Sequence, residues 1–350
     1  MTSQTNSIGR FLLAAGLLSS AIHAAYVLFA PIGFLETRPI VDDTFYYWMI
    51  ARHFWESFSF TFDGINPTNG FQPLWQWMLL PFGLLPRDFQ LRASLLLAVG
   101  TYQAGAWLLA LWRVENPATR TAMRAAALLL WVNHRFVFEY ASSGMEFGLY
   151  LLVAAWAVAE FIRLRENPGA GLARFLAATA LLPLARVDGL GLSFFLWLLV
   201  LIQPGERSRA RVILHGLLSL APFVVWMIYN QLVFDAPLPI SGSVKRLDYR
   251  HTLQESGLSF GSAGWMVATA KHTVTLMAGN SLRFFSGWLP ATGLPRVVEL
   301  GGGALSLLAA LAGFAWRLRS LGAAREAWNA YASLGALAAF ILVQATVYSA

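Results

Sequence analysis

Long apolar runs recur along this chain with short polar connections between them, and this pattern limits the fold more than any other feature. A transmembrane helix needs about 20 apolar residues. A chain of 350 residues that is 57% hydrophobic and 12% charged has more apolar surface than a soluble core can hide. We therefore expect an all-α polytopic membrane protein with about nine transmembrane helices and no soluble domain. The runs fall at residues 11–30, 89–112, 121–139, 146–163, 172–186, 189–203, 211–231, 297–316 and 327–348.

The formal net charge of +7 raises the question of nucleic-acid binding, and the placement of the arginines argues against it. They are scattered in the short connections between apolar runs, with no long basic run, which is typical of the cytoplasmic loops of membrane proteins. The chain has no cysteine, which excludes disulfides and thiol chemistry. We expect membrane lipids, and no nucleic acid, among its partners.

The run 73–86 decides the topology, because it has only about 14 residues and an internal proline. If it crossed the membrane, three arginine clusters would lie opposite the N-terminus, against the positive-inside tendency. If it lies flat or re-enters, the N-terminus and all the clusters are cytoplasmic. We adopt the second threading, in which the other face carries segments 31–88, 140–146, 186–189 and 232–296. Richness in Ala, Leu, Arg and Trp hints at a bacterial inner membrane, with these segments in the periplasm.

The outer segment 31–88 is expected to contain helices in the plane of the membrane. Residues 43–57, "DTFYYWMIARHFWES", begin at an Asp suited to N-capping and are rich in aromatic residues, which suits a helix in the headgroup layer. The sequence "FDGINPTNG" then predicts a turn, and 73–86 a second in-plane or re-entrant helix. We expect similar behaviour in the second outer segment, 232–296, and a single transmembrane domain over 1–350.

Two adjacent acids, Asp42 and Asp43, stand at the start of this aromatic stretch. Adjacent like charges disfavour each other and can raise one pKa. Keeping both beside a low-dielectric boundary indicates proton abstraction or cation binding. An alternative remains open for Asp43, which could serve only as a helix cap, although capping does not account for Asp42.

Further charged residues are predicted at the same face, each with an alternative. Glu146 could bind a ligand or cap the span that begins near Gly144. For Asp188, a local ion pair with Arg186 is favoured over direct chemistry. Lys245 and Arg246, behind a Ser-Gly-Ser turn, could bind a phosphate at headgroup depth or anchor to lipid headgroups in general.

An ordered series of short motifs over roughly residues 10–250 resembles the GT-C superfamily of integral membrane glycosyltransferases. The closest likeness is to bacterial enzymes that use polyprenyl-phosphate sugars, including the arabinofuranosyl- and mannosyltransferase-like branches. Later stretches, "SGMEFGLY", "ARVDGL" and "APLPISGSVK", also resemble elements of that family, although Val-Asp replaces its usual Pro-acid and leaves the role of Asp188 open. The motifs of the first outer segment are Asp42-Asp43, Phe45 to Tyr47, Ser59 to Phe62, Thr68-Asn69-Gly70 and Pro73-Leu74-Trp75.

The resemblance implies an inverting transfer of a sugar from a polyprenyl-phosphate donor to a hydroxyl of a glycan, lipid or protein acceptor at the periplasmic face. No cofactor is required, and a divalent cation remains possible beside the paired acids. The implied roles are Asp42 as general base, Asp43 in orienting the acceptor or the base, Glu146, Asn69 and Gln72 in binding hydroxyls, and Lys245 with Arg246 on the departing phosphate.

Two other classes compete with an enzyme. A transporter or flippase for a lipid-linked sugar usually places ionisable groups near mid-membrane, whereas the acids here stand at the ends of apolar runs. A non-catalytic assembly partner would not need paired acids beside an interfacial aromatic helix. The sequence therefore favours the glycosyltransferase.

Overall fold

The computed structural model of the chain describes residues 2–37, 40–131, 142–167, 169–203, 208–240, 262–268 and 271. The chain forms two compact units, Met1–Pro237 and Leu238–Ala350. The first unit contains nearly all of the described residues. The last two predicted spans, 297–316 and 327–348, and most of the second outer segment lie outside the described residues.

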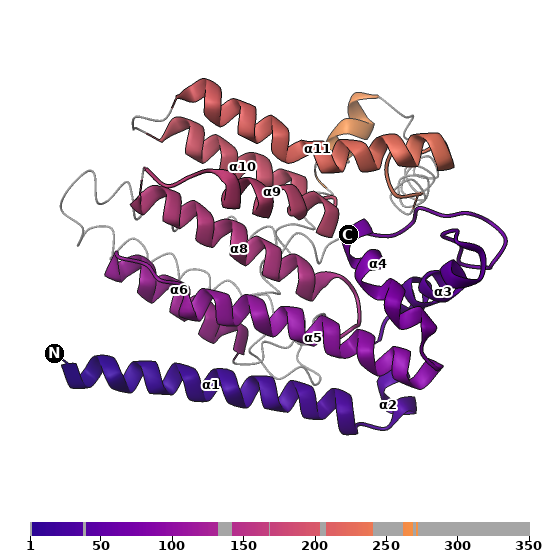
Figure 1. Cartoon of the computed structure of the whole chain (residues 1–350), viewed down its shortest axis with the longest axis horizontal. Helices are drawn as coiled ribbons and strands as arrows, with labels where there is room; N and C mark the ends of the chain where they lie inside the picture. Colours follow the sequence, from indigo (N-terminus) through magenta and orange to yellow (C-terminus); the bar gives the residue numbers. More distant parts are fainter. Residues whose placement is uncertain are drawn as a thin grey trace. The chain divides into compact units, whose positions relative to one another are not determined.

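The described part of the first unit is helical, as expected, and the isolated bridge Thr61–Pro67 is the β-pairing found in it. Figure 1 shows the helices of this unit running back and forth along one direction. They are α1 (Thr2–Phe29), α2 (Ile32–Thr37), α3 (Asp42–Ser57), α4 (Pro73–Leu79), the 3-10 helix η1 (Leu80–Leu84), α5 (Arg87–Leu111), α6 (Pro117–Trp131), α8 (Phe147–Glu166), α9 (Ala173–Ala185), α10 (Gly189–Ile202) and α11 (Arg209–Phe234).

Four of these helices are long and apolar enough to cross a membrane: Arg10–Phe29, Arg87–Leu111, Phe147–Glu166 and Arg209–Phe234. Two more, α9 and α10, are apolar but have only 13 and 14 residues. At 1.5 Å per residue each is about 20 Å long, which is less than the hydrocarbon core of about 30 Å. The helical membrane character expected from the apolar runs is therefore supported, whereas the count of nine spans stays a prediction.

The segment 73–86 forms two short pieces, α4 and η1, of 7 and 5 residues. Pro81 lies at the start of η1, where a missing N–H is tolerated, and Pro86 precedes α5. Seven residues of α-helix cover only about 10 Å. The segment is therefore not one continuous helix long enough to cross a membrane, and the threading that keeps it on one side stays a prediction.

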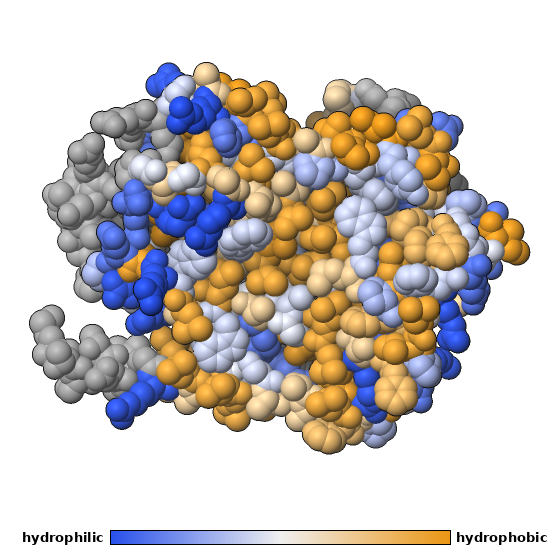
Figure 2. Space-filling model, viewed as in Figure 1, coloured by the Kyte–Doolittle hydropathy of each residue, from blue (hydrophilic) through white to orange (hydrophobic). Residues whose placement is uncertain are grey.

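The turns between the helices gather at two ends of the bundle. We call the end that carries α2, α3, α4 and the turns 142–146 and 186–188 the loop end, and the opposite end, where α1 begins, the arginine end (Figure 1). In Figure 2 apolar side chains cover the middle of the visible face and hydrophilic side chains gather toward both ends. This distribution suits a bundle whose middle lies in lipid.

The centre of the unit is α8. The most apolar 18-residue stretch of this helix is 83% buried, against 28% for that of α1 and 22% for that of α11. It packs closely on α5 because small residues stand at the contact. A Cβ on Gly148 would lie 2.2 Å from the backbone oxygen of Ala98, and a Cβ on Gly105 would lie 3.1 Å from the Cα of Leu152. Such small-residue contacts let membrane helices approach each other.

Two ion pairs join α8 to α9. At the loop end, Arg186 lies 2.5 Å from Glu146, and at the arginine end Arg174 lies 2.6 Å from Glu160. The glutamates are buried, with 2% and 0% of their side chains exposed. Loss of Arg186 would leave Glu146 buried without an arginine, which is strongly destabilising, whereas Glu160 also pairs with Arg163 of its own helix. The register of the two helices is thus fixed at both ends of α9.

Candidate functional site

A buried carboxylate, Glu146, lies at the centre of the loop end. It holds the N-cap position of α8, as one of the two alternatives for this residue has it, but its side chain makes no capping hydrogen bond. Its Oε1 accepts a hydrogen bond from Nη1 of Arg186 at 2.5 Å, and its Oε2 accepts one from the Tyr47 hydroxyl at 3.0 Å. These two donors compensate the cost of burying the charge.

Arg186 joins Glu146 to a second acid. Its Nε donates to Oδ1 of Asp188 at 3.1 Å, which confirms the predicted local ion pair. Burial alone would lower the pKa of Arg186, but the carboxylates of Glu146 and Asp188 outweigh it and raise that pKa. The Arg186 side chain is 19% exposed and that of Asp188 is 41% exposed, so Arg186 lies between the buried Glu146 and an acid in contact with solvent.

Tyr47 connects α3 to this ion pair. Its hydroxyl donates to Glu146 and accepts the backbone N–H of Gln72 at 3.0 Å. Its backbone oxygen accepts from Nε2 of Gln76 at 3.2 Å. Burial, followed by the charge of Glu146, raises the pKa of Tyr47 well above its ordinary value. The phenol therefore stays protonated and remains a donor to Glu146.

The two amide residues predicted to bind sugar hydroxyls both contact the protein backbone. Oε1 of Gln72 accepts the N–H of Val187 at 3.1 Å, which ties the start of α4 to the 186–188 turn. Asn69 is buried, with 1% exposed, and its Nδ2 donates to the backbone oxygen of Ala236 at 3.0 Å. In this arrangement these side chains tie the 69–72 segment to two distant parts of the chain, the 186–188 turn and the backbone at Ala236.

Asp42 and Asp43 are exposed residues in the first turn of α3. The N-cap is Val41, which has an extended backbone and no side-chain capping bond, so the interpretation of Asp43 as a helix cap is wrong, and the helix begins one residue earlier than expected. Oδ1 of Asp42 accepts the N–H of Asp43 at 3.0 Å. Within the described ranges neither carboxylate makes an ion pair. The positive end of the helix dipole stabilises such charges by about 0.3–1 kcal/mol.

The start of α3 is anchored on the turn that precedes Glu146. The Thr44 hydroxyl donates to the backbone oxygen of Ser143 at 2.6 Å. Gly144 has a φ of +83°, and a Cβ there would lie 2.7 Å from Cγ2 of Thr44. Glycine is suited to this position because it adopts positive φ without strain and leaves room for the contact. The paired acids therefore directly precede a residue, Thr44, that is bonded to the Glu146 turn.

Lys245 and Arg246 lie outside the described residues. In the part of the chain that the structure describes, no group of three or more His, Cys, Asp or Glu side chains is arranged to hold a metal ion.

Two residues of this cluster, Tyr47 and Arg186, are not among the site residues that the sequence predicts. The sequence pattern points to Arg186 only as the partner of Asp188, and to Tyr47 only as part of an aromatic stretch. The sequence gives one weak indication that Tyr47 belongs to the site. It follows Asp43 by four positions, and residues four apart lie near the same side of a helix.

Comparison of the chain with protein-family models, with curated proteins and with solved structures finds no match. The likeness to GT-C enzymes therefore depends on the quoted sequence motifs alone.

Proposed function

We propose that the chain is an inverting glycosyltransferase that moves a sugar from a polyprenyl-phosphate donor to an acceptor hydroxyl on a glycan, lipid or protein. The observation that carries the proposal is the convergence of four motifs far apart in sequence. Residues 42–47, 69–72, 143–146 and 186–188 meet at the loop end and are linked by hydrogen bonds around one buried carboxylate.

In the proposed topology the loop end faces the periplasm of a bacterial inner membrane, and about nine helices cross the bilayer. A polyprenyl-phosphate sugar would lie with its tail in the lipid and its phosphate at the interface. The acceptor would arrive from water. The position of exposed acids at the first turn of α3, beside a bundle end rather than in its middle, supports a reaction at this depth.

The proposed step forms one bond and breaks one. The acceptor oxygen attacks the anomeric carbon from the face opposite the phosphate, and the bond between that carbon and the phosphate oxygen breaks. The hydroxyl proton passes to Asp42, which acts as general base, and the polyprenyl phosphate leaves with the bonding electrons. Asp43 orients the acceptor or the base. The configuration at the anomeric carbon is inverted.

Stabilisation of the leaving phosphate is assigned to cations at the same end. Lys245 and Arg246 keep the role implied by the resemblance. We add Arg186, because its Nη2 makes no hydrogen bond with a described residue while its other donors are held by Glu146 and Asp188. Glu146, only 2% exposed, then acts as a positioning residue for Arg186. Asn69 and Gln72 hold the segments that border the acceptor. The step requires no metal ion.

The test measures consumption of candidate polyprenyl-phosphate sugars by the purified full chain in proteoliposomes, with mass spectrometry of the released polyprenyl phosphate. Loss of a general base lowers turnover by about 10²–10⁴-fold, so Asp42→Asn is expected to reduce kcat at least about 100-fold. Asp88→Asn is a matched control, because Asp88 is also an exposed acid in the first turn of a helix. It is expected to leave the rate unchanged.

The outcomes separate the assignments. If folded Asp42→Asn and Asp43→Asn proteins both keep full transfer, the mechanism is wrong. Loss of activity in Asp43→Asn alone would move the base to Asp43. If the lipid-linked sugar crosses the bilayer without being consumed, the chain is a flippase. Activity that EDTA abolishes and Mg²⁺ restores would show that a divalent cation takes part.

A further inference from the structure

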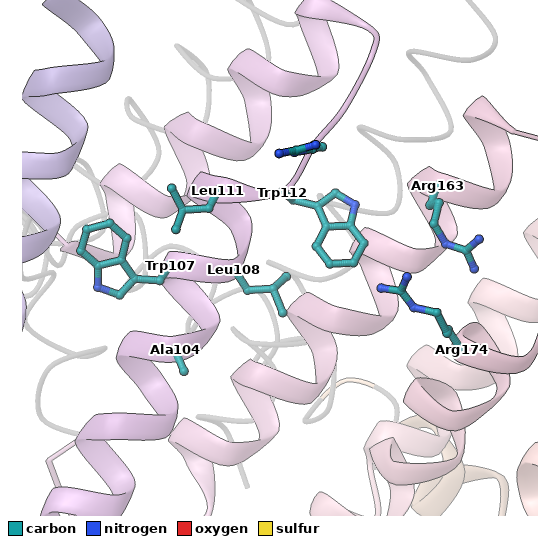
Figure 3. A pocket seen from close by; sticks show the side chains of 8 residues that line it. Ala104, Trp107, Leu108, Leu111, Trp112, Arg163 and Arg174 are labelled. Atoms are coloured by element: carbon teal, nitrogen blue, oxygen red, sulfur yellow. The ribbon is translucent and has the colours of Figure 1, made fainter.

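The arginine end carries an amphipathic cavity that plays no part in the proposed reaction. It has a volume of about 610 Å³ and lies beside the last turns of α5 and α8 and the first turn of α9. One wall is apolar and comes from α5, with Trp107, Leu108 and Leu111 (Figure 3). Figure 3 shows the guanidinium groups of Arg163 and Arg174 directed toward each other beside Trp112.

A second cavity of about 550 Å³ shares part of this lining. It has Leu111, Trp112, Arg113 and Arg163 in common with the first and adds further arginines from α6. We call the two together the arginine pocket. Its cations are Arg113, Arg120, Arg124, Arg163 and Arg174.

Two of the cations are held in place by protein contacts. Glu160, whose side chain is fully buried, accepts from Arg163 at 2.5 Å and from Arg174 at 2.6 Å. Nη2 of Arg163 also donates to the backbone oxygen of Gly171 at 3.0 Å, and the guanidinium of Arg174 lies 5.6 Å from the ring centroid of Trp112. The two charges are therefore presented at fixed positions beside an aromatic face.

The other cations leave positive charge unmatched. Within the described ranges Arg113 and Arg124 make no ion pair, and Arg120 donates to the backbone oxygens of Val114 and Glu115. Among the residues that the structure describes, the acids nearby are Glu115, Glu160 and Glu166, so five arginines face three glutamates there. Glu166 already accepts the backbone N–H groups of residues 115 and 116, at 2.9 Å each.

The chemistry of this pocket fits a lipid better than a soluble anion. Arginine binds phosphate oxygens through paired N–H donors. The apolar wall continues along α5, a helix long enough to cross a membrane, and Trp side chains favour the interface. A soluble anion would make no use of that wall. Basic pockets between transmembrane helices are suited to anionic lipid headgroups.

We propose that the arginine pocket binds the phosphate of an anionic membrane phospholipid, with an acyl chain lying along the apolar wall of α5. Arg163 follows Glu146 by 17 positions in the sequence, which is about 26 Å along α8. The lipid site is therefore in the leaflet opposite the loop end and is separate from the proposed reaction.

The experiment uses the full chain, purified and delipidated, with native mass spectrometry of bound phosphatidylglycerol and phosphatidylcholine. We expect phosphatidylglycerol to bind at least 10-fold more tightly. Arg113→Ala is expected to weaken it about 10-fold, or about 1.4 kcal/mol, and Arg113→Ala/Arg124→Ala to weaken it further. Arg209→Ala is the matched control, because Arg209 is an exposed arginine at the same end that lines neither cavity. It should change binding less than twofold.

A second arm tests the source of the phosphate. Leu111, which is 62% exposed, tolerates a polar replacement, so Leu111→Asn should weaken long-chain phosphatidylglycerol and leave the weak binding of inorganic phosphate unchanged. Inorganic phosphate that binds as tightly as the lipid would indicate a soluble anion and overturn the proposal. Equal losses from Arg113→Ala and Arg209→Ala would also overturn it, because diffuse surface charge would then account for binding. Equal affinity for phosphatidylglycerol and phosphatidylcholine would likewise overturn the proposal.

Discussion

The ion pair between Glu146 and Arg186 provides the most direct measurement of what holds the loop end together. We consider Glu146→Gln, Arg186→Met and the double variant. The glutamate is 2% exposed and the arginine 19% exposed. Removing one partner of a buried ion pair costs about 3–5 kcal/mol, because the other charge stays buried and unpaired. The lower end, about 3 kcal/mol, is expected for Glu146→Gln, since Arg186 keeps Asp188, and a glutamine can still accept from Tyr47.

The assay is reversible unfolding in mixed micelles, which gives a free energy of unfolding for each member of the double-mutant cycle. Contacting residues couple by 0.5–3 kcal/mol, and we expect about 2 kcal/mol for this pair. A matched control is Arg87 with Glu36, a pair at the same end with atoms 2.8 Å apart but with 69% and 26% of the side chains exposed. Its coupling is expected to be below about 1 kcal/mol. A coupling for Glu146 and Arg186 no larger than that of the control would refute the argument from burial.

Three further predictions concern packing, pH and topology. Gly148→Ala should destabilise the fold by about 1–3 kcal/mol, because the new Cβ would lie 2.2 Å from a backbone oxygen of α5, whereas Gly100→Ala, with nothing within 4 Å, should be neutral or stabilising in thermal unfolding. The pKa of Asp63 is lowered from 3.8 to about 2 by hydrogen bonds from the turn that follows it. The ionised carboxylate therefore stabilises this turn above pH 3.8, and the stabilisation is lost as the pH falls toward 2. Amide hydrogen exchange in the turn, measured against pH, checks this. The chain has no cysteine, so single Ile65→Cys and Ala210→Cys variants can be labelled without background, and both positions are exposed. The two variants should react with an impermeant thiol reagent from opposite sides of the membrane. If both react from the same side, the threading is wrong.

The positions of the helices followed closely from the apolar runs. The run 89–112 corresponds to Arg87–Leu111, and the run 146–163 to Phe147–Glu166. Burial in lipid requires every backbone group to bond within its own helix, so a sufficiently long apolar run has little alternative. Helix ends were less predictable. An extended Val41 caps α3 without a side-chain bond, and Asp42 and Asp43 lie inside the first turn, where the helix dipole favours them.

The pairing of side chains at the loop end was only partly predictable. The Arg186–Asp188 pair is local, so its two members could be matched from their spacing. The bonds from Tyr47 and Arg186 to Glu146 join residues 99 and 40 positions apart. Such contacts depend on the register of α3, α8 and α9 against one another, and this register is set by close packing that the pattern of apolar residues does not encode. Glu146 could be identified from its isolation as an acid, but its partners could not.

The two ion pairs between α8 and α9 limit how this unit can move. A slide of α9 along α8 by one helical turn, about 5.4 Å, would separate Arg186 from Glu146 and Arg174 from Glu160 together. Glu146 would then be buried without an arginine, and Glu160 would keep only Arg163 of its own helix. The α8–α9 pair therefore acts as a rigid frame. Any opening that admits a lipid-sized molecule to the loop end must therefore come from elements outside this frame. Among the long helices α1 is the best placed for this, because it packs on α5 and α6 and its most apolar stretch is only 28% buried.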